Sequence, residues 1–87
     1  MYNLLIADDE PLMRRGIKKL IDFESLKIKN IFEAENGEQV LEIVRTEEID
    51  IVLLDINMPR LDGLSVAEKL KEFNSDIKIA IVTGYNY

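Results

Sequence analysis

Short apolar runs alternate with amphipathic stretches along the chain, and this alternation constrains the fold more than any other feature. The runs with the length and composition of buried strands are residues 2–7, 28–34, 49–54 and 77–83. The stretches whose apolar residues repeat at helical spacing are 13–21, 40–44 and 66–73. Strands that alternate with helices form right-handed parallel βαβ units. The sequence therefore predicts an α/β fold built on a doubly wound parallel sheet.

The predicted strands differ in their polarity, which indicates where each lies in the sheet. Residues 49–54 form the most continuous apolar run, which is typical of a central parallel strand buried on both faces. Residues 28–34 are more polar and favour a position near an edge. Pro11 suits the first turn of the first helix, where its missing N–H costs nothing. The Asn36-Gly37 pair predicts a turn before the second helix, which ends near Thr46.

Composition narrows the possible functions. The chain has 87 residues, of which 47% are hydrophobic and 32% charged, so we expect one small folded domain spanning residues 1–87. Its net charge of −6 argues against a nucleic-acid surface. It contains no cysteine and no histidine, which excludes a disulfide framework and the commonest zinc ligands. With neither a membrane span nor a signal-peptide pattern, we expect no membrane association and a cytoplasmic location.

Three aspartates follow directly after predicted strands: Asp8 and Asp9 after the first, and Asp55 after the third. In open α/β sheets ligands bind at the carboxyl ends of the strands. Carboxylates gathered there raise one another's pKa unless a cation offsets them, and Mg²⁺ with its oxygen ligands is the natural solution. A carboxylate beside Mg²⁺ can accept a phosphoryl group as an acyl phosphate. The cluster therefore predicts magnesium-dependent phosphate chemistry.

Each residue alone has a simpler interpretation. Asp8 and Asp9 are also typical of an acidic helix N-terminus, and Asp55 of a turn. Thr83 suits a strand as a β-branched residue, and Asp62 before Gly63 suits a turn or a helix cap. Only the joint arrangement favours a functional site.

The whole pattern resembles the receiver domain of two-component response regulators. The resemblance rests on the Asp8-Asp9 pair, the strand-terminal Asp55, the run Met58–Gly63, and Thr83-Gly84, and it covers the whole chain. It implies a flavodoxin-like, CheY-like sheet with strand order 2-1-3-4. It also implies a signalling module with weak phosphotransfer chemistry at most, and therefore not an enzyme.

The resemblance implies a role for each site residue. Asp55 would be the phosphoacceptor, taking its phosphoryl group from a phosphohistidine on a partner sensor histidine kinase. Asp9 would bind Mg²⁺ directly and Asp8 mainly through water, with Asp55 and the backbone carbonyl of Asn57 as further ligands. Thr83 would supply the hydroxyl that moves toward the phosphoryl group.

The first helix resembles the element by which receivers dock on their kinase. Its basic residues are Arg14, Arg15, Lys18 and Lys19. An ordinary solvated helix face explains the same charges equally well. The stretches 14–17 and 83–85 resemble regulators with an AraC-type DNA-binding output, although this domain itself is not expected to bind nucleic acid.

The chain departs from the family at its end. Receivers have about 120 residues, within the usual size of a domain, so the fourth helix, fifth strand and fifth helix would be missing from a truncated receiver. The family's phosphoryl-contacting lysine, at the end of the fifth strand, then has no counterpart here. The run 77–83 would become an exposed apolar edge, and such edges pair with other chains. We therefore expect a homo-oligomer in which another copy covers this strand.

Two other functions remain open. The first is an inert or oligomerising receiver fragment that no longer phosphorylates, because small cores are marginally stable. The second is a haloacid-dehalogenase-like phosphohydrolase, which also uses a strand-terminal aspartate with Mg²⁺. In that family a second aspartate usually lies two residues on, where this chain has Asn57, and the nucleophile lies on the first strand. Both departures disfavour the hydrolase.

Overall fold

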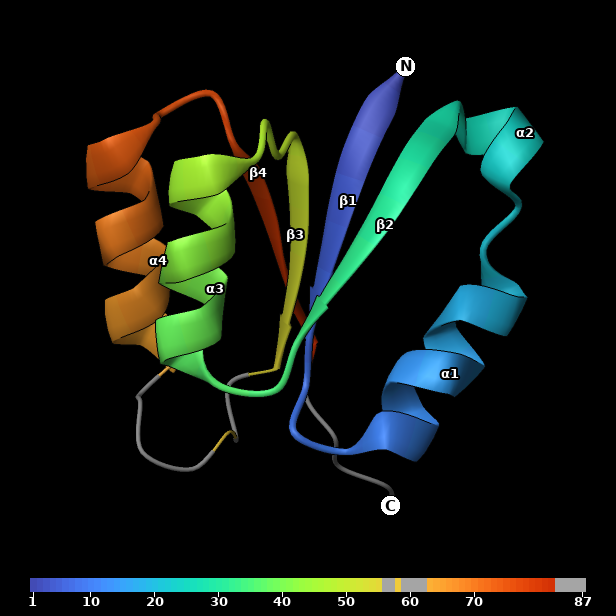
Figure 1. The fold of residues 1–87 in the computed structure, drawn as a ribbon, viewed down its shortest axis with the longest axis horizontal. Coiled ribbons are helices and arrows are strands. Elements are labelled where there is room, and N and C mark those ends of the chain that lie inside the picture. The colour runs from blue at the N-terminus through green and yellow to red at the C-terminus, as the bar shows by residue number, and fades with distance from the viewer. Residues whose placement is uncertain (56–57, 59–62, 83–87) are drawn as a thin grey trace.

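The computed structural model describes residues 1–55, 58 and 63–82, and within them four strands form one parallel sheet (Figure 1). The strands are β1 (Tyr2–Ala7), β2 (Ile28–Ala34), β3 (Ile51–Asp55) and β4 (Lys78–Val82). Their order is β2-β1-β3-β4, and every neighbouring pair is parallel. The predicted α/β class and strand order are confirmed, with the more polar strand β2 at an edge.

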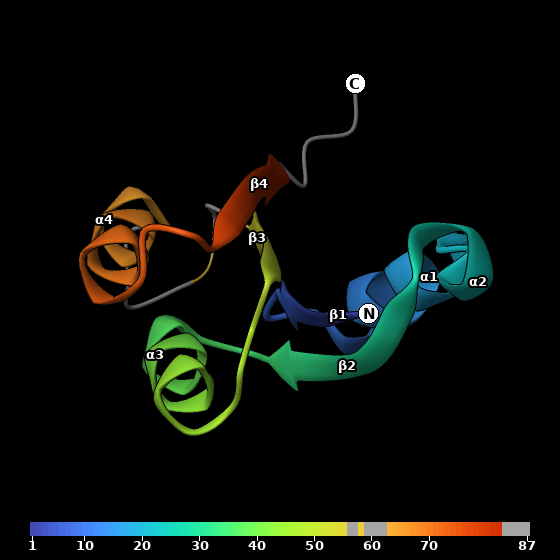
Figure 2. The same cartoon turned by 90° about the horizontal axis from the view of Figure 1, so that it is seen from above.

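Helices cover both faces of the sheet. They are α1 (Pro11–Leu20), α2 (Phe23–Leu26), α3 (Gly37–Thr46) and α4 (Gly63–Phe73). Helices α1 and α2 lie on one face, and α3 and α4 lie on the other (Figure 2). No helix in the described part of the chain is long and apolar enough to cross a membrane.

The short helix α2 was not predicted, because one helical turn shows no periodicity in the sequence. Its ends explain why it forms. Asp22 accepts hydrogen bonds from the backbone N–H and the hydroxyl of Ser25, at 3.2 and 2.7 Å, as an N-cap does. Lys27 ends the helix in the left-handed region, with φ of 58°.

The register of the sheet brings the carboxyl ends of its central strands to one level. Ala7, the last residue of β1, lies opposite Ala34 on one side and Leu54 on the other. On the far side of β3, Asp55 pairs with Val82. Whatever follows β1 and β3 in the chain therefore emerges at the same edge of the sheet.

Strand bounds differ slightly from those predicted. Strand β3 begins at Ile51, two residues later than expected, and includes Asp55, because Asp55 still pairs with β4. Ile49 is buried but precedes the strand. Strand β4 is described from Lys78 to Val82, so the predicted last residue of this strand, Thr83, lies outside the described residues.

The larger core lies between the sheet and α3 with α4, and includes the fully buried Val40, Val52 and Leu70. The core on the α1 face is smaller, with few buried residues. Strand β3 was predicted to be buried on both faces. On the face covered by α1 this prediction is wrong, because Ile51 and Leu53 are only half-buried there. Helix α1, which contributes no buried residue, covers that side of the sheet less completely.

Candidate functional site

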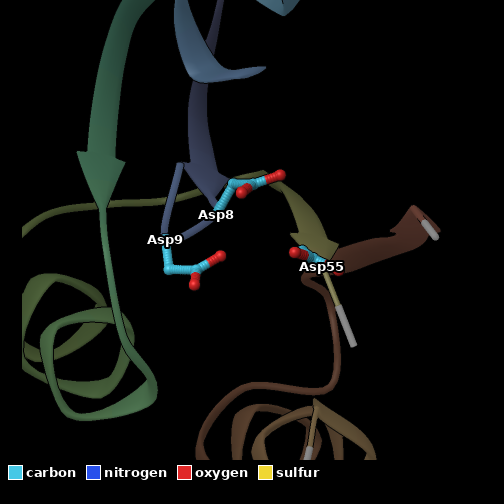
Figure 3. Close-up of side chains that lie close together, drawn as sticks. All are labelled: Asp8, Asp9 and Asp55. Atoms are coloured by element: carbon cyan, nitrogen blue, oxygen red, sulfur yellow. The ribbon is translucent and has the colours of Figure 1, made fainter. Parts of the chain in front are cut away.

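Three carboxylates converge at the carboxyl edge of the sheet. Asp8 and Asp9 follow the last residue of β1, and Asp55 is the last residue of β3. Because β1 and β3 are neighbours, one carboxylate oxygen from each aspartate lies within 4.8 Å of the others (Figure 3). The predicted clustering of these three side chains is confirmed.

The site is partly withdrawn from water, which changes its electrostatics. Asp8 and Asp55 are only 3% and 6% exposed, and Asp9 is more accessible than either. Burial is the main cause that raises the pKa of Asp8 above its ordinary value, and the charges of Asp55 and Asp9 raise it further. The hydrogen bond from the Glu10 backbone N–H acts in the opposite direction.

Both backbone groups and the side chain of Asp8 are hydrogen-bonded. Its N–H donates to the carbonyl oxygen of Ala34 at 3.0 Å. Its Oδ1 accepts from the backbone N–H of Glu10 at 2.9 Å, and its carbonyl oxygen accepts from Nη1 of Arg14 at 2.6 Å. These bonds come from the neighbouring strand, the following turn and α1, so they hold the Asp8 segment from three sides.

The helix-capping interpretation of Asp8-Asp9 is not supported by the start of α1. The N-cap of α1 is Glu10, whose side chain makes no capping hydrogen bond, and the first turn of the helix holds no acidic residue. The bond from Glu10 N–H to Asp8 lies within the turn before the helix. The pair of aspartates therefore faces Asp55 instead of completing the helix.

The donor set fits a hard divalent cation. All three side chains offer carboxylate oxygen, which Mg²⁺ and Ca²⁺ prefer. An Mg²⁺ ion binds oxygen at about 2.1 Å, so two of its ligands lie at most about 4.2 Å apart. The observed upper limit of 4.8 Å between the three oxygens is close to that span, and the residues present therefore fit this ion.

Comparison with known proteins identifies the family. Residues 4–87 match the family model of the response regulator receiver domain. The chain belongs to this family. Its members are signalling modules of two-component systems, and the fold described above is their CheY-like fold.

The nitrate/nitrite response regulator NarL of Escherichia coli K12 is 37% identical over 84 residues, which are 97% of this chain and 38% of NarL. The chain thus spans about two fifths of the curated relatives it matches. Its structure superposes on the two-component transcriptional regulator AraC of Clostridium phytofermentans with a TM-score of 0.91 and 28% identity, covering 99% of this chain and 69% of the other.

TrrA, a response regulator of Thermotoga maritima, is a second structural neighbour. In its complex with Mg²⁺ and BeF, TrrA matches this receiver domain with a TM-score of 0.84 and 36% identity, over 99% of this chain and 72% of TrrA. TrrA has also been crystallised with the histidine kinase ThkA, and that structure matches over the whole of this chain with a TM-score of 0.82.

Two predicted positions of the receiver site, Asn57 and Thr83, lie outside the described residues. Asp62, which was predicted as a turn or helix-cap residue, lies outside them as well. Met58, from the same run as Asn57, is described and is buried in the larger core. The structure thus places the three aspartates of the predicted site and leaves the other positions as predictions.

The basic residues of α1 in this receiver domain have different surroundings. Arg14 and Lys18 both form ion pairs with Glu33 on β2, at 3.0 and 2.8 Å, and the Arg14 side chain is only 14% exposed. Arg15 and Lys19 are exposed. The hydrogen bond from Lys18 is the main cause that lowers the pKa of Glu33, and Arg14 lowers it further. Sequence reasoning missed Glu33, because nothing in the pattern shows that the end of β2 faces α1.

Proposed function

We propose that this receiver domain accepts a phosphoryl group on Asp55 from a phosphohistidine of a sensor histidine kinase, with Mg²⁺ bound beside it. The observation that carries the proposal is the buried Asp55 at the end of β3, within 4.8 Å of the carboxylates of Asp8 and Asp9. The crystal structures of TrrA in complex with Mg²⁺ and BeF and with a histidine kinase support it.

In this proposal each residue of the site has a defined role. A carboxylate oxygen of Asp55 attacks phosphorus, the P–N bond to the kinase histidine breaks, and the imidazole leaves with the electron pair of that bond. Asp9 would bind the ion directly and Asp8 mainly through water, with Asp55 and the backbone carbonyl of Asn57 as the further protein ligands. When bound, Mg²⁺ neutralises charge on the transferring phosphoryl oxygens. The Thr83 hydroxyl then approaches the phosphoryl group.

The proposal also covers where the domain acts and which surface docks on the kinase. It acts in the cytoplasm as a phosphoacceptor with weak phosphotransfer chemistry of its own, and it docks on the kinase through α1. Arg15 and Lys19 are the exposed basic residues of that helix, whereas the docking role predicted for Arg14 and Lys18 competes with their ion pairs to Glu33. The similarity to transcriptional regulators favours control of transcription by a linked output domain.

Intact mass after incubation with Mg²⁺ and a small acyl-phosphate donor tests the proposal. We expect one phosphoryl group on the parent chain and none on Asp55→Asn. The matched control is Asp76→Asn, an exposed aspartate just before β4, which should be phosphorylated like the parent. A parent chain that gains no phosphoryl group would leave the inert fragment as the better description. Phosphorylation of Asp55→Asn would place the acceptor elsewhere.

We also propose that the 87-residue chain self-associates through β4. This strand is an edge of the described sheet, and its Ile81 is 43% exposed. Beside it, Ile79 and Ile81 line a mainly apolar groove together with Leu64 and Ala67 of α4. Unprotected apolar edges of this kind pair with other strands, and a second copy offers an identical one.

A further inference from the structure

Arg14 of α1 forms hydrogen bonds both to Asp8 in the acidic site and to Glu33 on the edge strand β2. Its Nη1 donates to the carbonyl oxygen of Asp8 at 2.6 Å, and its Nε donates to Oε1 of Glu33 at 3.0 Å. Glu33 is held in turn by Lys18, whose Nζ donates to Oε2 at 2.8 Å. The guanidinium is therefore fixed at both ends, which suits the rigid fork of donors that arginine presents.

The carbonyl group that accepts the hydrogen bond from Arg14 lies between the two aspartates of the acidic pair. It belongs to the peptide group that joins Asp8 to Asp9, so its direction sets where the chain carries Asp9. The N–H of Asp8 is already fixed by Ala34 at 3.0 Å, and Arg14 fixes the other end of the same residue. A hydrogen bond from a charged donor is stronger than a neutral one. Together these bonds leave the acidic pair little freedom of orientation.

We propose that Arg14 is a positioning residue for the metal ligands: it orients the Asp8-Asp9 segment toward Asp55, and Glu33 orients Arg14. The inference rests on the proposed magnesium site. It assigns to this arginine a role inside the domain in place of one at the kinase-docking surface. Groups that orient metal ligands in this way affect metal affinity on the order of tenfold or more when they are removed.

Electrostatics predicts in which direction the Mg²⁺ affinity changes if Arg14 acts only through its charge. A guanidinium close to the acidic site repels an incoming cation, so if Arg14 acted only through its charge, its removal would tighten Mg²⁺ binding. If Arg14 positions the ligands, its removal weakens binding in spite of the lost positive charge. The two explanations therefore predict opposite changes in the Kd for Mg²⁺.

Calorimetric titration of the 87-residue chain with Mg²⁺ measures this change. For Arg14→Met, which keeps the alkyl stem and removes the donors, we expect the Kd to rise on the order of tenfold. Arg14→Lys keeps one charged donor and should restore part of the affinity. The matched control is Arg15→Met, which removes the same charge from the exposed neighbour and should leave the Kd within about twofold of the parent.

A double-mutant cycle with Glu33→Gln tests whether Glu33 acts through Arg14. Glu33→Gln should raise the Kd in the parent background and change it little in the Arg14→Met background. Thermal unfolding without Mg²⁺ is measured on the same samples, so that a loss of affinity is read only from variants that are folded at the temperature of the titration.

The outcomes separate this inference from the proposed function. If the parent chain binds no Mg²⁺, the proposed metal site fails and the inference fails with it. If the parent binds and Arg14→Met binds equally well or more tightly, only the positioning role is overturned. If Arg14→Met is unfolded, Arg14→Lys and Glu33→Gln decide, because an unchanged Kd in both overturns the proposal.

Discussion

The charged form of Asp8 is disfavoured by the surroundings of this residue in the acidic site. Its carboxylate is buried beside two other carboxylates, and its pKa is raised above the ordinary 3.8. A raised pKa means that the folded protein binds this proton more readily than the unfolded chain does. The contribution of Asp8 to stability is therefore most favourable below pH 3.8, and it falls as the pH rises through the folded-state pKa.

The substitution Asp8→Asn should relieve this cost. The amide Oδ1 can still accept the hydrogen bond from Glu10 N–H, whereas the buried charge is gone. In buffer free of divalent cations at pH 7, we expect the free energy of unfolding to rise by on the order of 1 kcal/mol, as judged by urea denaturation. The gain should shrink as the pH is lowered through the raised pKa of Asp8, because Asp8 then becomes neutral in the parent too.

Asp76→Asn is the control for this prediction, because it makes the same chemical change at an exposed aspartate. Its effect should stay within about 0.5 kcal/mol. A loss of stability in Asp8→Asn at pH 7 would show that the carboxylate stabilises the folded state even without a cation.

At the scale of elements, α1 and α4 are both amphipathic but contribute unequally to the core. Helix α4 places Val66 and Leu70 in the larger core with no exposed surface. Helix α1 has no buried residue, and its Leu20 is 87% exposed. The same helical pattern in the sequence thus corresponds to very different burial.

Leu70→Ala should therefore cost about 2–5 kcal/mol of unfolding free energy, the usual range for emptying a buried leucine site. Leu20→Ala makes the same change on α1 and should cost less than about 0.5 kcal/mol. Urea denaturation of both variants with their parent measures the difference. Equal losses would mean that α1 is packed in solution as tightly as α4.

For the whole molecule, the two edges of the sheet are unlike. Strand β2 presents exposed polar residues, including Lys29, Asn30 and Glu33. Strand β4 has one exposed charged residue, Lys78 at its start, and then presents Ala80 and Ile81 as exposed residues between half-buried neighbours. Charges protect an edge from pairing with other chains, and apolar residues do not. Association of two copies is therefore expected at β4 and not at β2.

Sedimentation velocity at high micromolar concentration should show an oligomer of the 87-residue chain. Ile81→Lys places a charge on the β4 edge and should shift the population to monomer. Leu20→Lys, with the same change of charge on the exposed face of α1, should leave the oligomer intact. A parent chain that sediments as a monomer contradicts the prediction, and a monomeric Leu20→Lys variant would place the contact at α1.

The sequence by itself determined the strands, the parallel sheet and the meeting of Asp8 with Asp55. The reason is that local periodicity reports which residues are buried, and parallel strands necessarily end at the same edge. Strand order came only with the family resemblance. The aspartates could be placed because each lies at the end of a strand or within two residues after it, so their positions follow from the topology alone.

Only the tertiary structure decided which charged residues meet across elements. The ion pairs of Glu33 with Arg14 and Lys18, and the bond from Arg14 to the Asp8 carbonyl, join residues whose separation in sequence carries no signal. The one-turn helix α2 and the half-buried face of β3 were missed for a related reason. A local pattern states which side of an element is apolar, but how fully that side is covered depends on the elements that pack against it.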